Sequence, residues 1–171
     1  MNNKKHLTIA ALILFAVISR MMPHPFNFTA IGALALFCGS VFTNKKLAFI
    51  VPALAMFATD AMIGFHASMI PVYLCFSFAV LIGIKMIKQI NLITVPTASI
   101  ISSIVFFLVT NLPFWYADMS LYSLNWNGTM ESYTAALPFF ANQLAGDLFY
   151  SATFFGAYVV LKQKYFAPAN S

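Results

Sequence analysis

The stretch 45–60, KKLAFIVPALAMFATD, contains the pattern that decides the fold of this chain. It begins with Lys45 and Lys46, continues as an apolar run and ends at the carboxylate of Asp60. A long apolar run with few charges is typical of a helix that crosses a membrane. Since short loops rich in lysine and arginine stay cytoplasmic, the two lysines place the start of this run on the inner side.

The same arrangement repeats outward in both directions along the chain. Lysines precede the first apolar run, follow the fourth and follow the sixth, at Lys4, Lys5, Lys85, Lys88, Lys162 and Lys164. The alternation predicts an all-α protein with six transmembrane helices and with both ends inside the cell. The expected spans are roughly 7–22, 28–43, 47–64, 68–85, 94–111, and a sixth that begins between Tyr133 and Pro138 and ends at Leu161.

The composition is typical of a protein that is embedded in a lipid membrane. Of its 171 residues, 61% are apolar and 8% are charged, against about 25% charged in a soluble domain. We expect one domain, residues 1–171, in the bacterial cytoplasmic (inner) membrane as a multi-pass protein. The net charge of +5 is interpreted as topology and contact with anionic lipid, with no nucleic-acid partner. Cys38 and Cys75 lie in apolar runs and are expected to be packing residues, not a disulfide.

Three ionisable residues lie inside the expected spans at one depth. Arg20, Asp60 and Asp147 are each about 15 residues from the nearest flanking lysine, so all lie about 21–23 Å above the inner face. A charge at that depth costs a few kcal/mol unless it is paired or meets water. We therefore expect Arg20 within about 4 Å of at least one of the two carboxylates. Two interpretations stay open, a cluster that ties three helices together and the floor of a binding site.

More polar side chains gather in the outer half, whereas the inner half has almost none. Together with aromatic residues, they favour a cavity that is open to the outside and floored by charge. Such a cavity suits a small, flat, polar molecule. The candidate lining residues beyond the three ionisable ones are His24, Asn27, His66, Asn111, Asn142 and Gln143.

The longest expected loop, Pro113 to Ser132, is rich in aromatic residues, among them Trp115, Tyr116 and Trp126. One interpretation is an aromatic belt at the lipid headgroups. The other is a lid over the outward-facing cavity, and the two are compatible.

Sequence motifs of catalysis are missing from the chain. It has no H-E-x-x-H, no G-x-S-x-G and no P-loop signature, and no cysteine and histidine spacing that suits a metal. We therefore expect no enzyme activity, no cofactor and no metal site. Because the chain has no nucleotide site, uptake by it would need an energising partner or an ion gradient.

Several stretches resemble a known family. They are RMMPHPFNFTAIGALALF at 20–37, PALAMF at 52–57 with GFH at 64–66, and PFF at 138–140 with GDLFY at 146–150. They are similar to a domain-of-unknown-function family of small bacterial six-helix membrane proteins. More widely, the architecture resembles the S components of energy-coupling-factor (ECF) vitamin transporters.

The likeness to S components implies an S-component-like bundle with an outward pocket, which would work with coupling and ATPase subunits. Docking of such a partner would need a helix face of small residues, which permits close approach in lipid. Two stripes are candidates for it, Ala35–Gly39–Thr43 on the second span, and Ala152 with Gly156 on the sixth.

We accordingly expect a substrate-binding subunit for the uptake of a small, flat, heterocyclic micronutrient from the outer side. One alternative is a structural or assembly subunit of a membrane complex, in which the charge cluster only holds helices together. The other is a small proton-coupled transporter that works as an oligomer, with Asp60 or Asp147 as its proton site.

Overall fold

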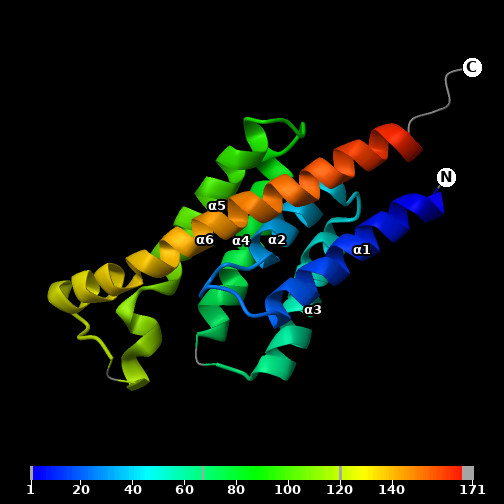
Figure 1. Ribbon diagram of the computed structural model, residues 1–171. Coiled ribbons are helices and arrows are strands. Elements are labelled where there is room, and N and C mark those ends of the chain that lie inside the picture. Colours follow the sequence, from blue (N-terminus) through cyan, green and yellow to red (C-terminus); the bar gives the residue numbers. More distant parts are fainter. Residues whose placement is uncertain (1, 67, 120, 167–171) are drawn as a thin grey trace, which may run out of the picture.

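The all-α prediction is confirmed by a computed structural model, which describes residues 2–66, 68–119 and 121–166 (Figure 1). Within these ranges the chain forms six α-helices and no strand. A short 3₁₀ helix, η1 (Pro113–Met119), precedes the last α-helix, and a π-helical turn, η2 (Lys162–Phe166), follows it. The α-helices are α1 (Asn2–Met21), α2 (Ile31–Val41), α3 (Lys45–Ile63), α4 (Met69–Met86), α5 (Thr94–Thr110) and α6 (Trp126–Leu161).

Helix α2 is the centre of the bundle. Every residue from Ile31 to Gly39 is buried, and the helix packs against α3, α4, α5 and α6. A β-carbon built on Gly39 would come within 2.2 Å of the Val80 carbonyl oxygen of α4, so the two backbones touch there. The Ala35–Gly39 part of the first candidate docking stripe is therefore a contact within the chain and offers no face to a partner.

Helix α2 is also shorter than the predicted span 28–43. Pro23 and Pro25 keep the preceding segment out of a helix, and Asn27 has a left-handed backbone with φ of 64°. Together they turn the chain between α1 and α2, and the Phe28 amide donates to the Pro25 carbonyl at 3.0 Å within this turn. The turn brings Phe28 against Gly146 of α6, where a β-carbon would come within 3.1 Å of the Phe28 α-carbon.

The predicted start of the last span, between Tyr133 and Pro138, is wrong. Helix α6 begins at Trp126, where the Asn125 side chain accepts a hydrogen bond from the Gly128 amide at 2.9 Å and caps the helix. It then continues through Pro138. The end of the predicted loop, from Trp126 to Ser132, is consequently helical.

Three helices, α3, α4 and α6, are long and apolar enough to cross a membrane. Leu7–Met21 of α1, α2 and α5 are apolar but shorter. Large apolar side chains such as Leu54, Ile70 and Phe149 are exposed on the outside of the bundle. The structure therefore has the apolar outer surface and the helices of a membrane protein.

Several lysines gather at one end of the bundle, which we call the lysine end. The start of α1 and the end of α6 lie on the same side (Figure 1), and α1 contacts η2 there. Lys88 and Lys162 line one cavity at this end. The Lys45 ammonium donates to the Phe42 carbonyl at 2.9 Å, at the end of α2. Helix η1 and the start of α6 lie at the opposite end (Figure 1).

Candidate functional site

An ion pair joins the end of α1 to α3. Arg20 Nη2 lies 2.6 Å from Asp60 Oδ1, as expected from the equal depth of the two residues. Arg20 Nη1 also donates to Thr59 Oγ1 at 2.5 Å, and the Tyr73 hydroxyl of α4 donates to Asp60 Oδ2 at 2.7 Å. The Asp60 side chain is 1% exposed and that of Arg20 is 14% exposed. Both oxygens of the buried Asp60 carboxylate therefore have a donor. Together with Tyr73, the ion pair connects three helices, α1, α3 and α4.

Asp147 of α6 lies apart from this pair. Its Oδ2 accepts from the Ser103 hydroxyl at 2.8 Å and from Gln143 Nε2 at 3.5 Å. Its Oδ1 packs against Gly32, where a β-carbon would come within 2.2 Å. Among the described residues, no ion pair joins Asp147 to a basic side chain. The expected contact with Arg20 thus holds for Asp60, whereas Asp147 is a buried carboxyl group held by neutral donors.

Arg20 and Asp147 nevertheless line one cavity of about 580 Å³, which we call the Arg20 cavity. Its wall comes from all six α-helices, from the turn after α1 and from the connection between α3 and α4. Met56, Phe76 and Phe106 supply its apolar part, and His66 and Gln143 add polar groups. Asp60 does not line it, and its two carboxylate oxygens are bound by Arg20 and Tyr73. The cavity therefore presents one neutralised arginine and one carboxyl group without a cation.

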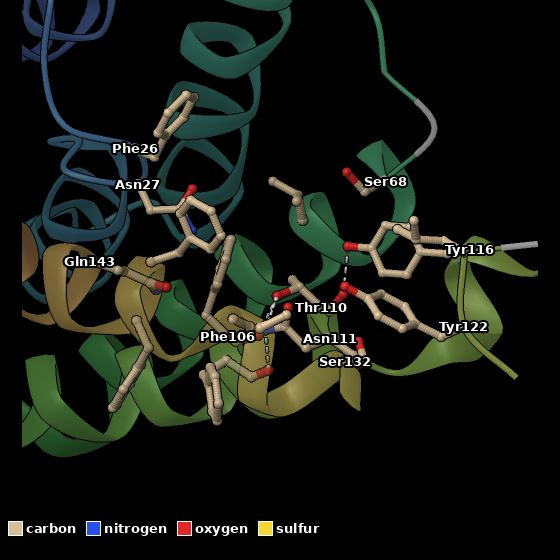
Figure 2. A pocket seen from close by; sticks show the side chains of 17 residues that line it. Phe26, Asn27, Ser68, Phe106, Thr110, Asn111, Tyr116, Tyr122, Ser132 and Gln143 are labelled. Atoms are coloured by element: carbon tan, nitrogen blue, oxygen red, sulfur yellow. Dashed lines mark hydrogen bonds between the residues drawn. The ribbon is translucent and has the colours of Figure 1, made fainter. Parts of the chain in front are cut away.

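A second cavity of about 320 Å³, the Tyr116 cavity, adjoins the first. In Figure 2, Asn27 and Gln143 lie at one end of it and Tyr116 and Tyr122 lie at the other. The two cavities are adjacent parts of one hollow that leads from Arg20 and Asp147 to η1. They share six lining residues, Phe26, Asn27, Ser68, Val72, Phe106 and Gln143.

Helix η1 closes the far end of the Tyr116 cavity. The Tyr116 hydroxyl donates to the Thr110 carbonyl at 2.9 Å (Figure 2), and Trp115 Nε1 donates to the Val109 carbonyl at 2.7 Å. Burial, and secondarily the neighbouring Tyr122, raise the pKa of Tyr116, so its hydroxyl stays a neutral donor. Of the aromatic residues in the loop predicted as a lid, Tyr116 and Tyr122 line the cavity, whereas Trp115 does not and Trp126 is 73% exposed.

The hollow brings together six of the ten predicted site residues. Asn27 and Gln143 line both cavities, Asn111 lines the Tyr116 cavity, and Arg20, His66 and Asp147 line the Arg20 cavity. The other four, His24, Asp60, Trp115 and Asn142, line neither. His24 instead faces the Pro25 carbonyl, with its Nδ1 at 2.8 Å from the oxygen.

Sequence reasoning missed the neutral groups around these charges, which are Thr59 beside Arg20, Tyr73 beside Asp60, and Ser103 and Gly32 beside Asp147. One signal was present: Ser99, Ser102 and Ser103 all lie in the apolar run of α5, and all three are buried. A row of hydroxyl groups inside an apolar helix indicates a polar neighbour, since buried hydroxyls need hydrogen-bond partners. Tyr73 gave no comparable signal.

Residues 1–169 match the family described as "Family of unknown function (DUF6580)", and the chain belongs to this family. The predicted membership in a domain-of-unknown-function family is thus confirmed. Comparisons with curated proteins and with solved structures find no significant match.

Proposed function

We propose that this protein is a membrane-embedded substrate-binding subunit that captures a small, flat, polar micronutrient from the outer side. One observation supports this most directly: Arg20 and Asp147 line a cavity of about 580 Å³ that adjoins a second, aromatic one. Small-molecule sites typically measure about 300–1,000 Å³ and combine apolar walls with a few placed polar groups.

The proposed topology has six membrane helices and both ends in the cytoplasm. Three helices meet the length and hydropathy of a crossing, and the lysines at the lysine end favour a cytoplasmic position for it. Helix α2 covers only about 16 Å at about 1.5 Å per residue. It is enclosed by the other helices. The non-helical segment before it is largely exposed but lines the Arg20 cavity through Phe26, Asn27 and Thr29, and irregular backbone is tolerated at membrane depth where it lines a water-filled cavity. The hollow then opens toward the outside.

The charges in the cavity wall limit the chemical class of ligand that the cavity can bind. Arg20 and Asp60 neutralise each other, so the uncompensated group in the wall is Asp147. A ligand with an amino group or a protonated ring nitrogen would supply the missing positive charge or hydrogen-bond donor. Phe76 and Phe106 line the same cavity and provide aromatic faces for a planar ring. We infer a nitrogen heterocycle of the size of a vitamin or nucleobase.

Transport of such a ligand needs energy from elsewhere. The chain carries no phosphate-binding motif, so we propose a coupling protein and an ATPase as partners, as the architectural resemblance to S components implies. A second candidate, the small proton-coupled transporter, is favoured by Asp147 itself, a buried carboxyl group without a cationic partner among the described residues. Proton uptake that accompanies transport without an ATPase would distinguish this candidate.

A thermal-shift screen tests the binding proposal. Purified protein is heated with a panel of nitrogen heterocycles, because a ligand that binds only the folded state raises Tm. We expect at least one basic heterocycle to raise Tm of the wild type and to have no effect on Asp147→Asn. Glu131→Gln, which removes an exposed carboxylate, should respond like the wild type. An equal shift in Asp147→Asn would contradict the proposed role of this residue.

A further inference from the structure

The lysine end contains a cavity of its own, far from the proposed ligand site. It measures about 730 Å³ and lies between the ends of α2, α4 and α6. Lys88 and Lys162 line it, together with Tyr158 and Gln163. Among the acidic side chains that the structure describes, Asp60, Glu131 and Asp147, none lines this cavity. The cavity therefore presents two ammonium groups that no described carboxylate neutralises.

An apolar groove of about 400 Å³ continues from this basic cavity. The two share Ile90 and Val159 in their walls, so they are adjacent. The groove runs between the start of α5 and α6, with Val95 on one side and Ala152 and Phe155 on the other. Gly156 widens it, since a β-carbon built there would meet no atom within 4 Å. A ligand of the whole site needs an anionic head and an apolar tail.

The length of the groove fits one leaflet of a membrane. Its wall on α6 extends from Leu148 to Val160, which is about 18 Å at about 1.5 Å per residue. Half of the hydrocarbon core of a bilayer is about 15 Å thick. The groove is thus as long as an acyl chain that starts at the headgroup level, and the lysines stand at the level where a phosphate would lie.

We propose that this composite site holds one anionic phospholipid, with its phosphate at Lys88 and Lys162 and one acyl chain in the groove along α6. Basic cavities between membrane helices at the cytoplasmic side suit anionic headgroups. A partner helix in the groove would fill the apolar part but would leave both ammonium groups without an anion. Ala152 and Gly156, which the sequence offered as a docking stripe for a partner protein, would then contact the acyl chain of the lipid.

Native mass spectrometry of the delipidated full chain in neutral detergent tests the proposal. Phosphatidylglycerol and phosphatidylcholine with identical acyl chains are titrated separately. We expect one phosphatidylglycerol per chain, bound more tightly than phosphatidylcholine. Because each lysine near a lipid surface contributes about 1 kcal/mol, the double variant Lys88→Gln, Lys162→Gln should bind phosphatidylglycerol about tenfold or more weakly. The double variant Lys46→Gln, Lys85→Gln loses the same charge outside the cavity and should bind like the wild type.

The groove is tested separately by Gly156→Leu, which places a side chain in it at a position where a β-carbon meets no atom within 4 Å. This variant should weaken binding of both lipids, whereas Ala145→Leu, on an exposed position of α6 outside the groove, should not. Glycerol phosphate and inorganic phosphate should fail to compete with phosphatidylglycerol at equal concentration. The proposal is overturned if inorganic phosphate competes as well as the lipid, or if phosphatidylglycerol binds all variants equally. It is equally overturned if Gly156→Leu converts a dimer to a monomer, because a second copy then covers the groove.

Discussion

The carboxyl group of Asp147 lies in the space that a side chain on Gly32 would need, since a β-carbon there would come within 2.2 Å of Asp147 Oδ1. Gly32→Ala should therefore push Asp147 away from Ser103 and out of its position in the cavity wall. We expect a loss of about 1–3 kcal/mol in the free energy of unfolding, typical of overpacking, and loss of ligand binding. Gly156→Ala, at a helical glycine with open space, is the matched control. Unchanged stability and binding in Gly32→Ala would show that Asp147 does not need this contact.

Removal of the arginine should leave a buried carboxylate without its cation. Arg20→Ala is expected to lower the free energy of unfolding by about 3–5 kcal/mol, the usual cost of breaking a buried pair from one side. Thermal unfolding in detergent measures it, with Lys46→Ala as a control that removes an exposed positive charge. The double variant Arg20→Met, Asp60→Leu removes both charges and should recover most of the lost stability. If this double variant is as unstable as Arg20→Ala, the burial of an unpaired charge is not the cause.

The hydrogen bond from Tyr73 to Asp60 should contribute measurably to the free energy of unfolding. The Tyr73 hydroxyl donates to the charged Asp60, whereas the Tyr133 hydroxyl donates to the neutral Leu108 carbonyl. Tyr73→Phe should cost about 1.5–3 kcal/mol in unfolding free energy, and Tyr133→Phe about 1 kcal/mol. Equal losses in the two variants would mean that the hydrogen bond to charged Asp60 stabilises the fold no more than the bond to a neutral carbonyl.

The proposed topology predicts where each end of the bundle lies. Reporter fusions after Lys45, Lys88 and Lys164 should report a cytoplasmic position, and fusions near His24, His66 and Asn127 should report the outside. Paired reporters, one active only inside and one only outside, control for expression. An outside signal at Lys88 would contradict both the six-span topology and the outward direction of the cavity.

Sequence reasoning located the Arg20–Asp60 pair because depth can be counted along an apolar run. It did not place Asp147, since depth does not fix which side of a helix faces a neighbour: α6 turns Asp147 toward Gly32 and Ser103. The predicted start of the last span, between Tyr133 and Pro138, is too late because the cap at Asn125 starts the helix before it. Helix boundaries depend on such local contacts, which hydropathy alone does not reveal.

The walls of the hollow were only partly predictable for a related reason. Polar residues such as Asn27 and Gln143 stand out against an apolar background, so their clustering was visible in the sequence. Phe76 and Phe106 do not stand out in a chain with 19 phenylalanines, and only the packing of α4 and α5 selects them. Trp115 was predicted as a site residue because it is aromatic. Its indole instead donates a hydrogen bond to the Val109 carbonyl, and the neighbouring Tyr116 lines the cavity.

The central claim is that the Arg20 cavity holds a small molecule through Asp147. The most direct measurement is native mass spectrometry of protein extracted gently from its own membranes, comparing the wild type with Asp147→Asn and with Glu131→Gln. We predict a small-molecule adduct, at most one per chain, on the wild type and on Glu131→Gln, which is absent from folded Asp147→Asn. An adduct of the same mass and occupancy on Asp147→Asn, or no adduct on any of the three proteins, would contradict the claim.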